Sequence, residues 1–306
     1  MRIHETWYIV LNPSAGNGKA GKKLELLQRE LDQRSIPYEV VITASRRHAI
    51  ELVATAMRSG FRQFISIGGD GTHHEVVNGL LQDRSSEGPP PLLAIINAGT
   101  GNDWARMHHI PNEVVKGVEL IMKGKNILHS AGKISCMRDG KEVHRYFMNV
   151  AGMALDGRVM EKFPDSLKSV PAGYLIAGLK QLFAYRVPES TITLADKKLQ
   201  DKFITIHAGL CKFSGGGMQF VPHADPSGDQ LAVTLIEKMS IPKLLLKIPK
   251  IFLGTLLTHP KVKSFKCASL KVTSEEEIPI EADGEFLGYS PIAMECIPGA
   301  FRLIVP

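Results

Sequence analysis

Residues 64–81 read FISIGGDGTHHEVVNGLL, and this stretch decides the fold of the first part of the chain. Residues 64–67 are typical of a buried strand, and a helix is expected to run through Leu81. Between them, the turn Gly68-Gly69-Asp70-Gly71-Thr72 places backbone N–H groups where phosphate oxygens can approach. Asp70 and Thr72 add side chains for a ribose or phosphate contact. The alternative is a tight turn that these two side chains cap.

The same design recurs at the next strand along the chain. Residues 92–96 form a predicted strand, and it ends in the turn Asn97-Ala98-Gly99-Thr100-Gly101-Asn102-Asp103. Two adjacent crossover turns of this kind predict a single nucleotide-binding crevice.

Strands and helices alternate on both sides of these turns. We expect strands over residues 7–11 and 38–43, helices over 19–34 and 49–59, and a loop over 85–91. This alternation predicts a doubly wound, Rossmann-like parallel sheet.

Beyond about residue 125 the pattern is typical of antiparallel strands. We expect strands over residues 146–151, 203–208, 231–236, 270–273 and 278–282, interrupted by helices near 171–186 and 240–257. A length of 306 residues suits about two domains. The sequence therefore predicts an α/β domain over 1–125 and a mainly antiparallel β domain over 126–297.

Composition excludes several classes of protein. The chain is 44% apolar and 22% charged, as ordinary globular proteins are, so neither a disordered nor a disulfide-stapled chain is expected. Its net charge of +6 is mild for a nucleic-acid binder of this length, so no nucleic-acid partner is expected. The cysteines form no CxxC pair, no signal peptide is visible, and no apolar run reaches the ~18 residues of a membrane span. We therefore expect a soluble, cytoplasmic protein with reduced thiols.

One stretch holds the whole excess of positive charge. Between Lys238 and Lys266 there are seven lysines and no acid, with Leu, Ile and Phe between them. An ordinary packed helix with solvated lysines is the alternative, but a solvated face usually mixes charges of both signs. We therefore expect this stretch to meet an anionic membrane surface. Pro242 suits a helix start there, whereas Pro249 should kink or split the helix.

The glycines after the first strand resemble two known motifs and complete neither. Gly16, Gly18 and Gly21 satisfy GxGxxG, but the second strand ends at Thr43 with no acid beside it for a ribose. Residues 16–22 match a P-loop until Lys23 stands where a Ser or Thr should hold Mg²⁺. Simple turn glycines remain an equal interpretation.

The pair Asp283 and Glu285 flanks Gly284 directly after the predicted strand 278–282. By itself, Asp-Gly between apolar runs indicates a hairpin turn. His73 and His74 have no histidine partner four residues away, so a zinc site is not expected there.

Taken in order, these elements resemble the diacylglycerol kinase catalytic family, and most closely its soluble bacterial lipid kinases. The matching motifs are Asn12-Pro13-x-x-Gly16, Gly68-Gly69-Asp70-Gly71-Thr72-x-x-Glu75-Val76-Val77-Asn78-Gly79, Gly99-Thr100-x-Asn102-Asp103, Pro222-x-Ala224 and Asp283-Gly284-Glu285. The resemblance implies an N-terminal domain like that of NAD kinases and phosphofructokinases, followed by a β-sandwich. It also implies that the tail, residues 298–306, returns to the first domain.

The resemblance assigns roles to individual residues. The nucleotide-binding residues would be Asn12, Pro13, Gly16, Thr43, Gly68, Gly69, Asp70, Gly71, Thr72, Glu75, Thr100, Asn102 and Asp103. Asp283 and Glu285 would supply the catalytic base. A structural Mg²⁺ loop would follow Pro-x-Ala, with Asp225, Asp229 and Gln230 as ligands. In this chain the family's Asp-Gly pair is inverted to Gly228-Asp229.

The implied function is transfer of the γ-phosphate of ATP, with Mg²⁺, to a lipid hydroxyl, and diacylglycerol is the first choice. The protein would work at the inner face of the membrane, peripherally attached, and a homodimer is a further expectation. Two alternatives remain: a kinase of a small soluble substrate, like the NAD kinases, and a non-catalytic regulator that binds membrane lipid. Because both Asp283 and Glu285 are present, a non-catalytic regulator is disfavoured. The lysine-rich stretch disfavours a kinase of a soluble substrate.

Overall fold

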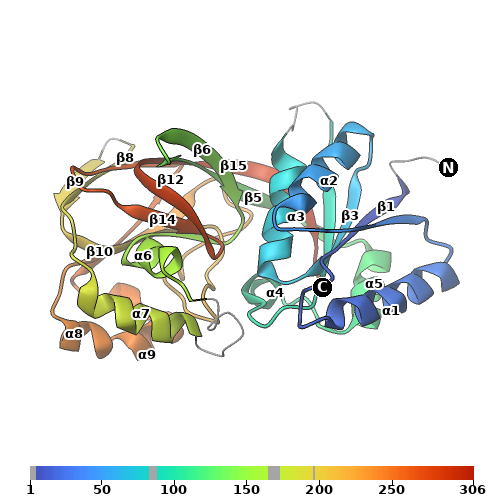
Figure 1. Cartoon of the computed structure of the whole chain (residues 1–306), viewed down its shortest axis with the longest axis horizontal. Coiled ribbons are helices and arrows are strands. Elements are labelled where there is room, and N and C mark those ends of the chain that lie inside the picture. Colours follow the sequence, from blue (N-terminus) through green and yellow to red (C-terminus); the bar gives the residue numbers. More distant parts are fainter. Residues whose placement is uncertain (1–4, 83–87, 165–172, 196) are drawn as a thin grey trace. The chain divides into compact units, whose positions relative to one another are not determined.

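The computed structural model describes residues 5–82, 88–164, 173–195 and 197–306, and the chain folds into two compact units. Unit 1 comprises Met1–His129 and Gly299–Pro306, and unit 2 comprises Ser130–Pro298. The chain therefore passes from one unit to the other twice (Figure 1).

Unit 1 contains a parallel sheet with the strand order β2-β1-β3-β4-β15. Its strands are β1 (Trp7–Leu11), β2 (Tyr38–Ile42), β3 (Gln63–Gly68), β4 (Leu92–Asn97) and the end of β15 (Glu285–Ile304). Arg302 and Leu303 of β15 pair with Leu92 and Leu93 of β4. All these strands run the same way, so the turns after β1, β2, β3 and β4 share one edge of the sheet.

Helices cover both faces of this sheet. Leu27 of α1 (Lys19–Gln33) and Val118 of α5 (Val114–Lys123) share one apolar cluster with Ile65 and Ile67. Because side chains alternate along a strand, Ser66 points to the opposite face, where its hydroxyl is 2.7 Å from Nδ1 of His73. His73 belongs to α3 (Asp70–Gln82), which packs beside α2 (His48–Arg58). A short helix, α4 (Asp103–Met107), follows the turn after β4.

Unit 2 is mainly antiparallel. One layer has the order β12-β11-β10-β7-β14, and β15 continues from β14 to β13, β8 and β9. The strands are β5 (Asn126–Arg138), β6 (Lys141–Phe147), β7 (Val150–Ala154), β8 (Ser190–Leu194), β9 (Lys197–Asp201), β10 (Phe203–Gly209), β11 (Leu231–Glu237), β12 (Val262–Cys267), β13 (Ser269–Thr273) and β14 (Pro279–Ala282). Apolar side chains from these strands form a continuous core between the layers.

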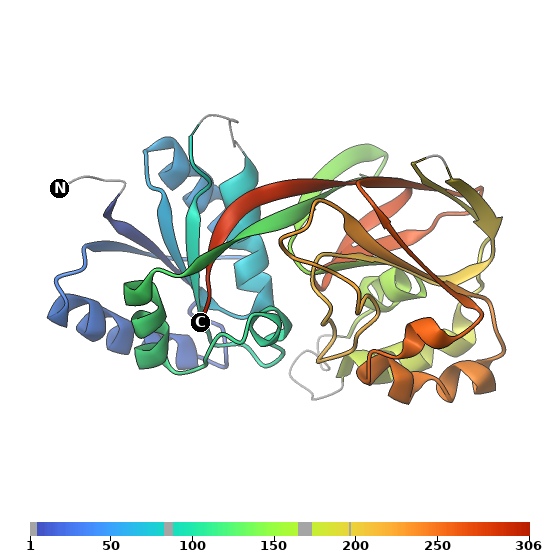
Figure 2. The same ribbon diagram turned by 180° about the vertical axis from the view of Figure 1, so that it is seen from behind.

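Within the described residues, four α-helices lie on one side of unit 2. They are α6 (Leu155–Glu161), α7 (Gly173–Ala184), α8 (Ile241–Leu245) and α9 (Ile248–Phe252), and a 3-10 turn spans Leu256–Thr258. Figures 1 and 2 both show α7 beside α8 and α9. In the part of the chain that the structure describes, no helix is long and apolar enough to cross a membrane.

The predicted fold class is confirmed, with one local difference. The strand expected over 146–151 is interrupted at Met148 and Asn149, because their N–H groups donate to the Asp283 carboxylate. The helix expected over 240–257 is split, as Pro249 predicts: α9 begins at Ile248 with this proline in its first turn. Parts of the expected loop 85–91 and helix 171–186 lie outside the described residues.

Candidate functional site

The nucleotide-binding residues predicted in unit 1 lie where strands β1 to β4 end. A pocket of about 290 Å³ is open at this edge. It is lined by Asn12, Pro13, Ser14, Thr43, Ala44, Ser45, Arg46, Thr72 and Glu75. Five of the predicted residues (Asn12, Pro13, Thr43, Thr72 and Glu75) therefore share one pocket.

Hydrogen bonds hold the pocket walls together. The side-chain amide of Asn12, after β1, donates to the hydroxyl of Thr72, in α3, at 3.0 Å. The Oδ1 atom of Asn12 accepts the backbone N–H of Ser14 at 3.0 Å. Glu75 accepts the backbone N–H of Arg47, after β2, at 2.9 Å. The loops after β1 and β2 are thus both fastened to α3.

The sequence did not single out four residues of this pocket, of which three, Ser14, Ser45 and Arg46, carry polar side chains. Arg46 is exposed at the rim of the pocket. A guanidinium group is well suited to phosphate, because it offers several N–H donors in one plane. Arg46 belongs to no sequence motif. Only its position on the loop after the second strand could have indicated that it lies at the pocket.

The remaining predicted residues of unit 1 form a second group, at the two glycine turns. The backbones of Gly69 and Gly99 touch: a Cβ on Gly99 would lie 2.6 Å from the Cα of Gly69. The Asp70 carboxylate accepts the N–H groups of Asp103 and Trp104 at 3.3 and 3.4 Å, at the start of α4. The side-chain amide of Asn102 donates to the Gly99 carbonyl at 2.9 Å. Asp70, Asn102 and Asp103 thus brace the two turns against each other.

Gly16 also joins this arrangement. It has a positive φ of 61°, and a Cβ there would lie 2.1 Å from the carbonyl oxygen of Ala98. Gly68, Gly71 and Thr100 complete the two turns, with Gly71 and Thr100 exposed. Every predicted nucleotide-binding residue therefore lies at one edge of the unit 1 sheet.

Lys23, which stands at the Ser/Thr position of the incomplete P-loop pattern, makes hydrogen bonds within unit 1. The ammonium group of Lys23 donates to the backbone carbonyls of Asn97 and Asn112. Partial burial lowers its pKa. Lys23 therefore ties α1 to the loops around β4.

In unit 2, Asp283 and Gly284 form the turn between β14 and β15. Both have positive φ angles, 49° and 81°, as a tight Asp-Gly hairpin requires, and Ala282 pairs with Glu285. The Asp283 carboxylate accepts three backbone N–H groups, from Met148, Asn149 and Val150, at 2.9 to 3.1 Å. Asp283 thus anchors the hairpin to the start of β7, and Glu285 is buried at the start of β15.

The three predicted metal ligands lie on one exposed loop of unit 2. Asp225 accepts the N–H of Ser227 at 3.0 Å, while Asp229 and Gln230 are exposed. Ser130 donates its backbone N–H to the Pro226 carbonyl at 2.7 Å and its hydroxyl to the Gly228 carbonyl at 2.6 Å. The donor set suits a hard cation such as Mg²⁺, because two carboxylates and an amide oxygen lie within six residues of one loop. Asp225 and Asp229 join no cluster of three His, Cys or acidic groups within the described residues.

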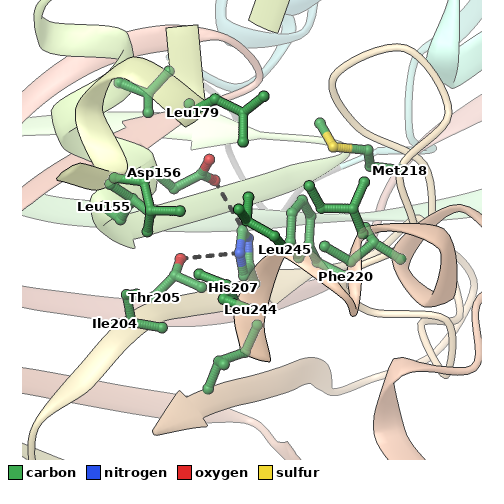
Figure 3. A pocket seen from close by; sticks show the side chains of 16 residues that line it. Leu155, Asp156, Leu179, Ile204, Thr205, His207, Met218, Phe220, Leu244 and Leu245 are labelled. Atoms are coloured by element: carbon green, nitrogen blue, oxygen red, sulfur yellow. Dashed lines mark hydrogen bonds and ion pairs between the residues drawn. The ribbon is translucent and has the colours of Figure 1, made fainter. Parts of the chain in front are cut away.

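A second cavity, of about 100 Å³, lies inside unit 2 and is almost entirely apolar (Figure 3). Helices α6 to α9 and strands β10 and β11 supply its walls. The lining residues are Leu155, Asp156, Val159, Gly178, Leu179, Leu182, Ile204, Thr205, His207, Met218, Phe220, Ile236, Leu244, Leu245, Ile248 and Ile251. No sequence motif marks this cavity, because its lining comes from many separate segments.

A buried polar cluster forms one wall of this apolar cavity. The hydroxyl of Thr205 donates to the Met153 carbonyl at 3.2 Å and lies 3.0 Å from Nε2 of His207. We assign the imidazole proton to Nε2, which leaves Nδ1 as an acceptor 3.4 Å from the Asp156 carboxyl group.

The protonation of the cluster agrees with this assignment. Burial lowers the pKa of His207 to about 3 and raises the pKa of Asp156 to about 7. Burial and the neighbouring Asp156 raise the pKa of Glu281 well above its usual range. The imidazole is therefore neutral near pH 7, and the buried acids bind protons more readily than exposed carboxyl groups do.

Comparisons with known proteins agree with this architecture. The diacylglycerol kinase catalytic domain model matches residues 6–134, and the YegS C-terminal NAD kinase beta sandwich-like domain model matches residues 149–305. A Staphylococcus aureus protein named diacylglycerol kinase is 27% identical over 292 residues, which cover 92% of this chain and 87% of that protein.

Solved structures share the whole fold. A crystal structure of a diacylglycerol kinase from Bacillus anthracis has a TM-score of 0.73 at 20% identity, and covers 100% of this chain and 98% of its own. Yeast NADH kinase, in a complex with NADH, has a TM-score of 0.60 at 9% identity, over 98% of this chain and 83% of that one. This chain therefore belongs to the diacylglycerol kinase family of bacterial type, with a catalytic α/β domain followed by a YegS-type β-sandwich domain.

Proposed function

We propose that this protein is an ATP-dependent lipid kinase that transfers the γ-phosphate of ATP to the free hydroxyl of diacylglycerol. The observation that supports a lipid acceptor is the cavity of unit 2, whose walls are apolar except for one buried polar cluster. A soluble acceptor such as a dinucleotide would need several charged or hydrogen-bonding partners instead.

The phosphate donor would bind at the sheet edge of unit 1. Phosphoryl transfer depends on positioning and on neutralising charge, so backbone N–H groups and a guanidinium group are the useful parts. The glycine turns offer N–H groups, and Arg46 lies at the rim of the neighbouring pocket. When bound with ATP, Mg²⁺ would neutralise phosphate charge.

Of the two candidate bases, we favour Glu285. The two carboxylate oxygens of Asp283 accept three backbone N–H groups, so this side chain stabilises the structure around the hairpin. Glu285 follows on the same hairpin, two residues later. Asp283 would then act as a positioning residue that holds the hairpin, and Glu285 would take the hydroxyl proton of the acceptor.

The apolar cavity would accept the end of an acyl chain. A volume of about 100 Å³ suits a few methylene groups, since a dry apolar cavity of about 150 Å³ can hold a benzene ring. Val159 of α6 lines this cavity and is buried. A larger side chain at Val159 would fill the space that the acyl chain needs.

The direct test is product formation from labelled ATP. We expect phosphatidic acid from diacylglycerol in neutral detergent micelles, and no labelled product from NAD⁺. A panel with monoacylglycerol and a polyprenol would identify a different lipid acceptor. Labelling of NAD⁺ alone would overturn the lipid assignment, and no product from any acceptor would favour the non-catalytic regulator.

Val159→Phe tests the role of the cavity. We expect it to raise the KM for long-chain diacylglycerol about tenfold, with less effect on a short-chain diacylglycerol and none on the KM for ATP. The matched control is Val143→Phe, because Val143 is half-buried on β6 and does not line the cavity. Equal effects of the two variants would show that the cavity does not hold the substrate.

A further inference from the structure

Helices α8 and α9 expose large apolar side chains to solvent. Leu246, which follows α8, is 75% exposed, and Leu253, which follows α9, is 72% exposed. Together with Phe183 of α7, at 70%, they are the most exposed large apolar side chains among the residues that the structure describes. Both views of the molecule place α7 beside these helices (Figures 1 and 2).

This exposure is not a sign of incomplete packing. Leu244, Leu245 and Ile251 turn inward and line the cavity of unit 2, and Ile251 is buried. The helices therefore bury one apolar side and carry a second set of apolar residues on the outside, which adds nothing to the core.

Lysines alternate with the exposed residues along the chain. Lys243, Lys247 and Lys250 lie on or between the two helices, and Lys261 joins them by donating to the backbone carbonyl of Lys238 at 3.0 Å. Burial is the largest cause of the lowered pKa of His259. The positive charges of four lysines lower this pKa further: Lys247, Lys250, Lys261 and Lys243. Lys250 also donates to the hydroxyl of Thr258, beside His259, at 3.3 Å, so lysines from more than one segment lie near this imidazole.

The nearest acid in the sequence does not neutralise this group. Glu237, just before the stretch, pairs with Lys263 at 2.7 Å. From Lys238 to Lys266 the chain contains no Asp or Glu. Exposed apolar side chains interspersed with lysines are complementary to an anionic bilayer, where the leucines enter the acyl region and the lysines meet the headgroups.

We propose that this surface docks the protein on an anionic membrane. The docking face consists of Lys238, Lys243, Lys247, Lys250, Lys261, Leu246, Phe252 and Leu253. The choice of a membrane as partner rests on the proposed lipid kinase function, and the same helices line the cavity proposed for the acyl chain. A substrate lipid would thus be taken from the bilayer on which the protein sits.

Vesicle sedimentation without ATP tests the docking face separately from catalysis. We compare vesicles of phosphatidylcholine alone with vesicles that contain equal parts of phosphatidylcholine and phosphatidylglycerol. We expect binding to the anionic vesicles, with weaker binding as salt is added. The triple variant K243Q/K247Q/K250Q should bind them roughly a hundredfold more weakly. Its control, K141Q/K198Q/K271Q, removes the same charge from exposed lysines of β6, β9 and β13 and should bind as the parent does.

A second variant keeps the proposal testable if the lysine variant folds poorly. Leu246→Ser with Leu253→Ser removes only exposed groups, so the melting temperature should hold while vesicle binding falls at least tenfold. Both docking variants should keep parental activity on diacylglycerol in neutral detergent. Parental binding by both variants, or an equal loss in the control, overturns the docking face. Vesicle binding without any kinase activity would instead refute the proposed function and leave the docking face standing.

Discussion

At the scale of single residues, Gly16 meets two demands at once. Its φ of 61° favours glycine, and its Cα lies so close to Ala98 that a methyl group would collide with the carbonyl oxygen. The contact joins the loop after β1 to the turn after β4. This residue could be predicted from the motif, but its contact with Ala98 could not, because the two lie 82 positions apart in the chain.

Gly16→Ala should therefore weaken ATP binding by at least tenfold, since the displaced loop carries Asn12 and the pocket wall. Gly18→Ala is the matched control: Gly18 also has a positive φ, 83°, but no atom lies within 4 Å of its missing Cβ. Both variants should lose about 1 kcal/mol of stability through backbone strain. Calorimetric titration with a non-hydrolysable ATP analogue measures the affinities, and equal affinities in the two variants would contradict the proposed contact.

Neutral substitutions of the two hairpin acids, Asp283 and Glu285, should have different effects on stability and turnover. Asp283→Asn replaces an acceptor oxygen by an NH₂ group that faces backbone donors, so we expect both a lower melting temperature and a loss of turnover. Glu285→Gln should lose turnover by two orders of magnitude or more, with the melting temperature and the KM for ATP nearly unchanged. Turnover close to that of the parent in Glu285→Gln would contradict the assignment of Glu285 and favour Asp283 as the base.

At the scale of elements, the sequence predicted most of what a local pattern can encode. The strands β1, β2, β3 and β4 follow from short apolar runs, and the split between α8 and α9 follows from Pro249. The break between β6 and β7 did not follow, because its cause is the distant carboxylate of Asp283. The apolar cavity could not be predicted from the sequence either, since a cavity depends on how separate elements pack.

The loop between β10 and β11 allows a test of the metal prediction. If Asp229 holds a structural Mg²⁺, the melting temperature of the parent should rise when Mg²⁺ is added, and Asp229→Ala should abolish that rise. Asp139→Ala is a suitable control, because Asp139 is an exposed acid of unit 2, 94% accessible, in the turn between β5 and β6. Thermal scans with Mg²⁺ and with a chelator decide the matter: equal rises in Asp229→Ala and the parent would mean that the ligand lies elsewhere.

At the scale of the whole molecule, unit 1 contains buried histidines that make its stability depend on pH. Burial lowers the pKa of His73 to about 4, and burial with neighbouring histidines lowers that of His108 to about 3. Between these values and about 6.5, the unfolded chain binds protons that the folded unit does not. The stability of unit 1 should therefore fall as the pH drops from about 6.5 towards 4, by up to about 1.4 kcal/mol per pH unit for each histidine.

Both tryptophans of the chain, Trp7 and Trp104, belong to unit 1, so tryptophan fluorescence reports on this unit. We expect the urea midpoint by fluorescence to be lower at pH 5 than at pH 7. His73→Gln keeps a polar partner for Ser66 without a group that titrates, and its midpoint should change less with pH. The same pH dependence in His73→Gln and the parent would exclude His73 as a source.

The order of the segments has a consequence for how the protein is made. Unit 1 contains residues that precede unit 2 in the sequence and residues that follow it. The later residues include Phe301 and Leu303 at the end of β15, which are fully buried in unit 1. During synthesis on the ribosome, β4 is translated long before the end of β15, its neighbour in the sheet. The edge of β4 therefore stays unpaired while all of unit 2 is translated. Unit 2 can reach its native state first, although it is encoded second. For this chain unit 1, which begins the sequence, is therefore the last unit to be completed, because its sheet gains the end of β15 only after the whole of unit 2 has been translated.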